Sequence, residues 1–211
     1  MLLAIDTSAG TGVAVVDRDR GVLAERVEPD TRRHAEVIGE LISQCLIESG
    51  IQVADLSGVA AGMGPGPFTG LRVGIAAAQA FALGAAKPVV RVISHDAIAF
   101  GHYAAGGSGP LLVVTDARRK EVYWSAYEGA DSVGIPVRSG GPGLARPDDL
   151  AAAVSGYGDY ERLDASLISA ASLGLLAESM YSHDRAFAGR DALYLRSPDV
   201  TLSAGPKRVT G

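Results

Sequence analysis

Cysteine is nearly absent from the sequence, since Cys45 is the single one in 211 residues. One cysteine excludes a disulfide within the chain and leaves no cysteine cluster that could hold zinc. No apolar run approaches the roughly 20 residues that span a bilayer, and the first residues lack the basic region of a signal peptide. We therefore expect no membrane segment and, by default, a cytoplasmic protein.

Positive charge and catalytic motifs are also scarce. Lys and Arg number 19 against 24 Asp and Glu, and the net charge of −5 argues against broad electrostatic binding of nucleic acid by this chain alone. The sequence has no phosphate-binding G-x-x-x-x-G-K-[ST] loop and no G-x-S-x-G nucleophile motif. Its four histidines show no metal-ligand spacing; they are His34, His95, His102 and His183. These absences do not favour a self-sufficient enzyme.

The most distinctive stretch, residues 58–84, combines a short apolar run, a Gly-Pro-Gly-Pro loop and an alanine-rich helix. The loop breaks regular structure, and we expect Thr69 to cap the helix that follows. One face of this helix collects residues at spacings of three and four, namely Gly70, Gly74, Ala77, Ala78 and Phe81. Each interior glycine costs roughly 1 kcal/mol, which indicates that another backbone comes close. This face packs either on the chain's own sheet or on a partner protein.

A second helix is expected from about residue 35 to residue 49, capped near Thr31. Its apolar positions repeat at helical spacing and are Val37, Ile38, Leu41, Ile42, Cys45 and Leu46. We interpret Cys45 as a small core or interface residue, because no neighbouring base would activate its thiol. A metal site at His34 would need a second histidine one turn later, and that position is Ile38. We therefore expect His34 to be a capping or surface residue.

Two apolar segments end in an aspartate that a hairpin follows, which is a weak internal repeat. Asp6 and Thr7 follow residues 2–5, and Asp116 follows residues 111–115. An acid and hydroxyls at that place can hold a metal–phosphate group, or they can satisfy the backbone of the turn. The repeat predicts two related lobes.

The lobe boundary is expected in the glycine-rich segment 101–110. We predict an N-terminal lobe of residues 1–103 and a smaller C-terminal lobe of residues 104–211, whose tail frays after a strand-like start near Leu193. Further strands are expected at 13–16, 22–27, 88–93 and 122–127, and further helices at 96–103, 147–154 and 167–181.

The densest basic cluster consists of Arg118, Arg119 and Lys120. It lies where the second hairpin turns. The cluster is either a solvated hairpin tip or a contact for RNA phosphate.

Four segments resemble the bacterial TsaB (YeaZ) family, in the same order along nearly the whole chain. They are LLAIDTSAGTGVAVV (2–16), GMGPGPFTGLRVGIAAAQAFALG (62–84), VTDARRKEVYWSAY (114–127) and YLRSPD (194–199). The most specific part resembles the family signature GPGSFTGLRIG, with Pro67 in place of serine and Val73 in place of isoleucine. The resemblance implies an α/β actin-like ATPase (ASKHA) fold of two ribonuclease-H-like lobes, the second one reduced.

The resemblance also implies a function. Members of the family take part in making N6-threonylcarbamoyladenosine (t6A) beside the tRNA anticodon, as non-catalytic subunits. They dimerise with TsaD, which carries the metal-binding histidine pair, and the ATPase TsaE joins the complex. From the low basicity of this chain we expect tRNA to bind only through the assembled complex. The partner surface would be the helices near 35–49 and 69–84, with Val37, Leu41, Cys45, Gly70, Val73, Gly74, Ala77 and Phe81. We expect Gly74→Arg to abolish the heterodimer while the monomer stays folded.

The same resemblance makes Asp6, Thr7 and Asp116 a vestigial nucleotide cleft, with weak or no binding of ATP or ADP and no bound metal. Two alternatives remain open. The chain could be an active enzyme of this fold, ATP-dependent or metallopeptidase-like, in which these residues work. It could also be a homodimeric scaffold that uses the same helix face, and we expect self-association when TsaD is absent.

Overall fold

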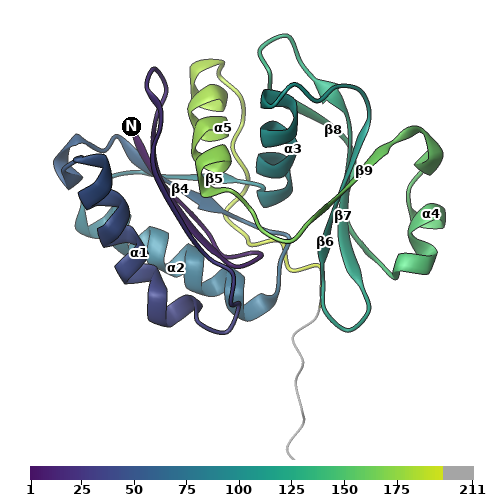
Figure 1. Cartoon of the computed structure of the whole chain (residues 1–211), viewed down its shortest axis with the longest axis horizontal. Coiled ribbons are helices and arrows are strands. Elements are labelled where there is room, and N and C mark those ends of the chain that lie inside the picture. The colour runs from purple at the N-terminus through teal and green to yellow at the C-terminus, as the bar shows by residue number, and fades with distance from the viewer. Residues whose placement is uncertain (197–211) are drawn as a thin grey trace, which may run out of the picture.

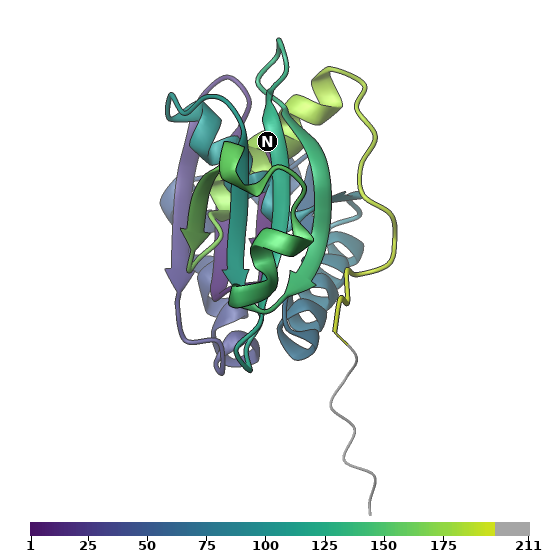
Figure 2. The same cartoon turned by 90° about the vertical axis from the view of Figure 1, so that its right-hand side faces the viewer.

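The computed structural model describes residues 1–196 and consists of two β-sheets with helices between and outside them (Figure 1). The helices are α1 (His34–Ser49), α2 (Phe68–Gly84), α3 (Ser94–Ala104), α4 (Leu150–Ala153) and α5 (Ala170–Ser182). Helices α1 and α2 cover the outer face of the first sheet, while α3 and α5 lie between the sheets. Figure 2 looks onto the second sheet and shows the short α4 in front of it. Within residues 1–196, no helix is both long and apolar enough to cross a bilayer.

Both sheets repeat one strand order. The first sheet has the order β3-β2-β1-β4-β5 and the second the order β8-β7-β6-β9. The strands are β1 (Leu2–Asp6), β2 (Thr11–Asp17), β3 (Gly21–Glu28), β4 (Gly58–Gly62) and β5 (Val89–Val92), then β6 (Leu111–Asp116), β7 (Val122–Ala130), β8 (Pro136–Ala145) and β9 (Glu161–Ala165). In each sheet three antiparallel strands are followed by a strand parallel to the first of them. Among residues 1–196 the second sheet has no counterpart of β5, so the predicted ASKHA fold with a reduced second lobe is confirmed.

The sheets lie on either side of the predicted boundary near residue 103, but the helices do not follow it. Helix α3, which precedes the boundary, packs on β6, β7 and β8 of the second sheet. Helix α5, which follows it, packs on the first sheet, where Leu173 and Leu176 join Leu2 and Ala4 in one core cluster. The two halves of the chain therefore exchange helices, and neither half encloses its core alone.

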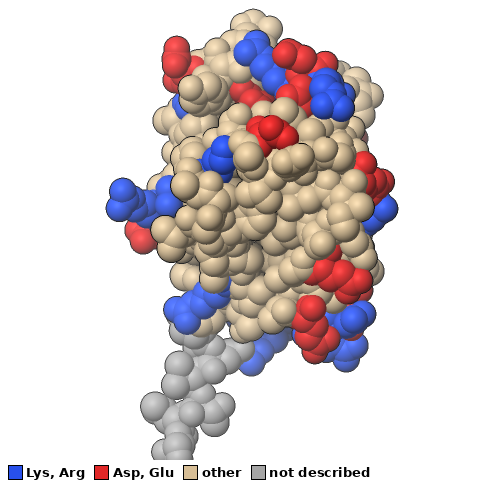
Figure 3. All heavy atoms as spheres, turned by 90° about the vertical axis from the view of Figure 1, so that its left-hand side faces the viewer, with Lys and Arg blue, Asp and Glu red and all other residues tan. Residues whose placement is uncertain are grey.

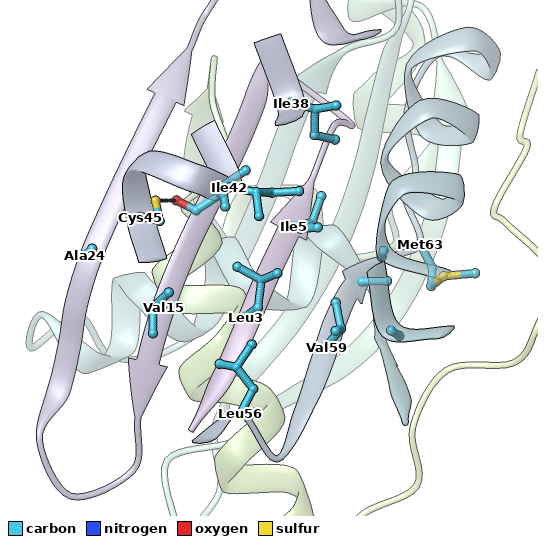
Figure 4. Packing of buried hydrophobic residues seen from close by; sticks show 14 residues of the cluster. Leu3, Ile5, Val15, Ala24, Ile38, Ile42, Cys45, Leu56, Val59 and Met63 are labelled. Carbon is cyan, nitrogen blue, oxygen red and sulfur yellow. Dashed lines mark hydrogen bonds between the residues drawn. The ribbon is translucent and has the colours of Figure 1, made fainter. Parts of the chain in front are cut away.

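Strand β1 is buried on both faces, which explains its unbroken apolar sequence. Side chains alternate along a strand, so Leu3 and Ile5 share one face of the sheet. On that face they pack with Ile38 and Ile42 of α1 (Figure 4). The opposite face carries Leu2 and packs on α5. The N-terminal strand thus anchors both layers of helices beside the first sheet.

Several predicted boundaries are wrong. Helix α2 begins at Phe68 with Pro67 as its N-cap and no side-chain cap, so Thr69 does not cap it. Helix α1 follows Arg33, not Thr31, also without a side-chain cap. Strands β8 and β9 were not predicted. Leu193 to residue 196 form no strand, and the rest of the predicted frayed tail lies outside the described residues.

Cys45 is a fully buried core residue whose thiol donates to the Val13 carbonyl at 3.3 Å (Figure 4). Burial raises the pKa of the Cys45 thiol to about 11. At neutral pH this leaves about 100-fold fewer thiolates than an ordinary cysteine has. We expect the native chain to resist Ellman's reagent for hours and the urea-unfolded chain to react at once. Ser43→Cys, on the exposed side of the same helix, is the control, and equal reaction of both thiols in the native state would contradict the prediction.

Candidate functional site: the Asp6 turn, the interlobe hub and the α1–α2 surface

The carboxylate of Asp6, in the turn after β1, is hydrogen-bonded by groups of the protein itself. Asp6 is 2% exposed; its Oδ1 accepts the Ser8 backbone N–H at 2.7 Å, and its Oδ2 accepts the hydroxyls of Ser94 and Ser8. Burial raises the pKa of Asp6, and the hydrogen bonds from Ser94 and Ser8 oppose that rise. A Cβ on Gly62 would lie 1.8 Å from Oδ2, so no side chain fits beside the carboxylate. Both oxygens therefore satisfy protein donors, as the turn interpretation of Asp6 predicts.

Thr7 explains the glycine face of α2. Its hydroxyl donates to the Gly70 carbonyl at 2.7 Å and accepts the Gly74 N–H at 3.0 Å. A Cβ on Gly74 would lie 2.2 Å from Thr7 Oγ1, and one on Gly70 would lie 2.7 Å from the Thr7 carbonyl oxygen. The glycines pack within the chain, so the expectation that Gly70 and Gly74 face a partner is wrong. An arginine at position 74 would strike Thr7 before it could reach any partner.

His34 is neither a cap nor a surface residue, which corrects the expectation from the sequence. It is 7% exposed, and its Nδ1 lies 2.8 Å from the Thr11 hydroxyl. Its Nε2 faces Gly70, where a Cβ would approach to 3.0 Å. Burial lowers the pKa of His34. One turn further, Ile38 lies in the hydrophobic core. Across residues 1–196, no group of three or more His, Cys, Asp or Glu side chains could hold a metal ion.

Asp116 lies in a different environment from Asp6. Its side chain is 65% exposed, and it accepts the Arg118 N–H at 2.8 Å and pairs with the Arg118 guanidinium at 3.4 Å. Arg118 also donates to the Thr31 hydroxyl at 2.7 Å and so joins the hairpin tip of the second lobe to the first. Weak or absent nucleotide binding between these acids stays a prediction, as does an RNA contact by residues 118–120.

The residues that join the lobes follow no motif in the sequence, and none of them was predicted as a site residue. Ser94, His95 and Asp96 open helix α3, and we call these three residues the interlobe hub. Ser94 faces the first sheet, where its hydroxyl donates to Asp6 and accepts the Gly64 N–H at 3.0 Å. The available signal was the run of three polar side chains at the start of a helix directly after a strand.

The other two hub residues face the second sheet. His95 is fully buried, with Nδ1 2.9 Å from the Ser125 hydroxyl and Nε2 2.9 Å from the Thr115 hydroxyl. Asp96 accepts the Tyr127 hydroxyl at 2.7 Å. Burial lowers the pKa of His95 to about 3, so the imidazole is neutral. The hub therefore fixes both sheets to the first turn of α3.

Comparison with known proteins supplies the family. The model of the tRNA N6-adenosine threonylcarbamoyltransferase family, TsaD, matches residues 16–135, which is more than half of the chain. A protein of Escherichia coli named tRNA threonylcarbamoyladenosine biosynthesis protein TsaB is 36% identical over 127 residues, which are 60% of this chain and 54% of that protein. An uncharacterized protein of Mycobacterium tuberculosis is 44% identical over 154 residues, covering 68% of this chain and 70% of the other.

A solved structure extends the similarity to the fold. YeaZ from Pseudomonas aeruginosa superposes with a TM-score of 0.73 at 27% identity, over 87% of this chain and 92% of that one. The chain belongs to the TsaB (YeaZ) family. The match of this TsaB-family chain to the TsaD family model runs from the end of β2 through β7, and it includes α1, α2 and the interlobe hub.

The α1–α2 surface of this TsaB-family chain differs in detail from the one expected. The eight predicted interface residues divide by exposure: Val37, Cys45, Gly70 and Gly74 are buried, whereas Leu41, Val73, Ala77 and Phe81 are partly exposed. The outward positions of α2 include Ala76, Ala80 and Leu83, the last of which is 84% exposed. Figure 3 looks at the side of the molecule where these helices end and shows a broad surface of uncharged residues with charges mainly around it.

Proposed function

We propose that this chain takes part in t6A biosynthesis as a non-catalytic subunit that dimerises with a TsaD-type transferase and activates it. The names of its relatives support the pathway, and the match to the TsaD family model supports a partner built on a related lobe. In this proposal TsaE joins the assembled complex, and tRNA binds only to that complex.

The observation that carries the proposal is that the second histidine of a metal-binding pair is replaced in this chain by a buried isoleucine. Helix α1 begins with His34, as the family resemblance implies for a ligand position. The next position on the same face is Ile38, which is 8% exposed and packed in the core. A second ligand cannot come from that turn of the helix, and His34 Nδ1 already meets Thr11. This supports loss of the catalytic metal site with retention of the lobe.

The surface that remains for a partner is the outer face of α1 and α2. Ala76 and Ala80 are exposed and small, and they permit close approach of another helix. Leu83 and Ile47, which are 84% and 77% exposed, supply apolar area beside them. A partner with an equivalent helix pair would complete a bundle of four helices across this face. Without a partner, an exposed apolar surface of this kind favours self-association of the chain. This is why we expect a homodimer when the transferase is absent.

Ala80→Arg tests the surface, because a long charged side chain at the centre of a helix interface prevents close packing and leaves a charge unpaired. We expect this variant to fold normally by circular dichroism, to lose its complex with the cognate transferase in size-exclusion chromatography, and to lose t6A formation. Ala152→Arg, at an exposed position of α4, is the matched control. A complex that survives Ala80→Arg unchanged contradicts this docking surface.

An omission assay tests the role itself. Purified transferase, ATPase and this chain are combined with unmodified tRNA, and each protein is left out in turn. We expect activity to need both the transferase and this chain, with this chain inert alone. Hydrolysis of ATP or modification of tRNA by this chain alone would instead support the active-enzyme alternative.

A further inference from the structure

We propose that Arg72 determines partner specificity: it is a pre-organised cation that receives a carboxylate from the partner helix lying along α2. This inference rests on the proposed function, because it names a residue within the proposed docking surface. Arg72 is exposed and is the sole charged residue of α2.

Two aromatic rings hold the Arg72 side chain. Its guanidinium carbon lies 3.8 Å from the centroid of the Phe68 ring and 5.8 Å from that of Tyr194. The two rings are themselves in contact, with centroids 4.8 Å apart, and Arg72 Nε lies 3.3 Å from the Tyr194 hydroxyl. Stacking of this kind fixes the plane of the guanidinium and lowers the entropy lost when it binds. The side chain is therefore ordered before any partner arrives.

Arg72 has no acidic partner among residues 1–196. Asp191 lines the same groove but forms no ion pair with it. Because Nε is used by Tyr194, the terminal nitrogens remain for a bidentate contact with a carboxylate. An ordered guanidinium without an acid partner, on the surface proposed for docking, is suited to an acid from another protein.

A groove beside Arg72 continues the α1–α2 surface. Its volume is about 430 Å³, and it lies between α2 and the segment 190–194, with Ile75, Ala76 and Gln79 on the helix side. Ala76 belongs both to this groove and to the outward face of α2. A helix docked on that face would thus reach Arg72 at its edge.

The charges of α1 and α2 indicate which helix of the partner supplies the carboxylate to Arg72. Helix α1 carries three exposed acids, Glu36, Glu40 and Glu48, whereas α2 carries Arg72 alone. The TsaD family model matches this lobe, so the transferase has a helix equivalent to α1. In the pseudo-two-fold pairing of related lobes that we propose, the transferase helix equivalent to α1 lies along α2 of this chain. We therefore assign the carboxylate to the α1-equivalent helix of the transferase.

Charge reversal tests this assignment. With purified transferase in titration calorimetry, we expect Arg72→Glu to weaken binding roughly 100-fold and Arg72→Lys roughly 10-fold, because lysine keeps the charge but not the planar bidentate contact. Arg20→Glu, in the exposed turn between β2 and β3, is the control for net charge. Reversing the matching acid of the transferase to arginine should restore binding to Arg72→Glu.

The outcomes separate this inference from the proposed function. If Ala80→Arg abolishes the complex while Arg72→Glu binds like the wild type, the role of Arg72 is overturned and the docking surface stands. If Arg72→Glu and Arg20→Glu weaken binding equally, the effect is one of net charge and the inference fails. If Arg72→Glu alters only self-association of this chain, the occupant is a second copy and the assignment to the transferase is wrong. If Ala80→Arg also leaves the complex intact, the docking surface itself is wrong.

Discussion

Gly74→Arg is expected to unfold the first lobe rather than merely remove a binding surface. A Cβ at this position would lie 2.2 Å from Thr7 Oγ1, and the Gly74 N–H donates to the same oxygen. Overpacking of this kind costs about 1–3 kcal/mol, and burying an unpaired guanidinium adds several more. Together these reach a large part of the about 5–15 kcal/mol that stabilise a domain. Circular dichroism and urea unfolding should show an unfolded or aggregated chain.

Milder substitutions separate packing from binding. Gly74→Ala adds one methyl group against Thr7 and should lower the free energy of unfolding by about 1–3 kcal/mol. Gly39→Ala is the matched control, because position 39 also lies inside a helix but has open space around its Cβ. There alanine should stabilise the chain by roughly 0.5–1 kcal/mol. Equal stability of the two alanine variants would contradict the role of Thr7 as the reason for the glycine.

Periodicity in the sequence identified a special face on α2 but not what lies against it. The spacing of Gly70 and Gly74 correctly indicates that a backbone approaches. That backbone is the turn at Thr7, more than 60 positions earlier in the chain. Local spacing carries no information on this contact, so the internal and the partner interpretations could be separated only in three dimensions. The exposed small residues, Ala76 and Ala80, lie on another side of the helix.

The hairpins of both lobes could be predicted because their signals are local. Unbroken apolar runs end in Asp6 and Asp116, and turn residues follow each of them. Strand β8 could not be predicted in this way, since its sequence PVRSGGPGLA is rich in residues that disfavour strands. Its glycines accommodate Trp124 of the neighbouring strand: a Cβ on Gly143 would lie 2.4 Å from that ring. Contacts between strands override propensity there.

The interlobe hub has even less local signal. His95 meets Thr115 and Ser125, which lie 20 and 30 residues away, and Ser94 meets Asp6 at a separation of 88. None of these pairs follows a motif spacing. A lone histidine in a sequence therefore appeared without a role, although the fold places it at the junction of the two sheets.

Acid should lower the free energy of unfolding at the interlobe hub, because the unfolded chain takes up one proton at His95 that the folded chain does not. Burial, together with the charge of Arg138, lowers the pKa of His95 to about 3, whereas the unfolded chain has the ordinary value of about 6.5. The folded state keeps His95 neutral while the unfolded state takes up a proton below that value. Stability from His95 is thus complete above about pH 6.5 and is lost as the pH falls toward about 3. Between about pH 7.5 and about pH 5.5 the loss should be about 1.4 kcal/mol.

His95→Gln isolates that proton, because glutamine can donate and accept but does not titrate. Its free energy of unfolding in urea should be lower than that of the wild type at neutral pH, since its amide fits Thr115 and Ser125 less well. This difference in the free energy of unfolding between the wild type and His95→Gln should then narrow by about 1.4 kcal/mol when the pH falls from about 7.5 to about 5.5. Burial raises the pKa values of Asp6 and Asp96, so these two acids make the folded state more stable as the pH falls, which is opposite to the effect of His95. Both acids are present in the wild type and in the variant, so their contributions cancel in the difference. If the difference in the free energy of unfolding between the wild type and His95→Gln stays constant with pH, then His95 is not held neutral between the lobes.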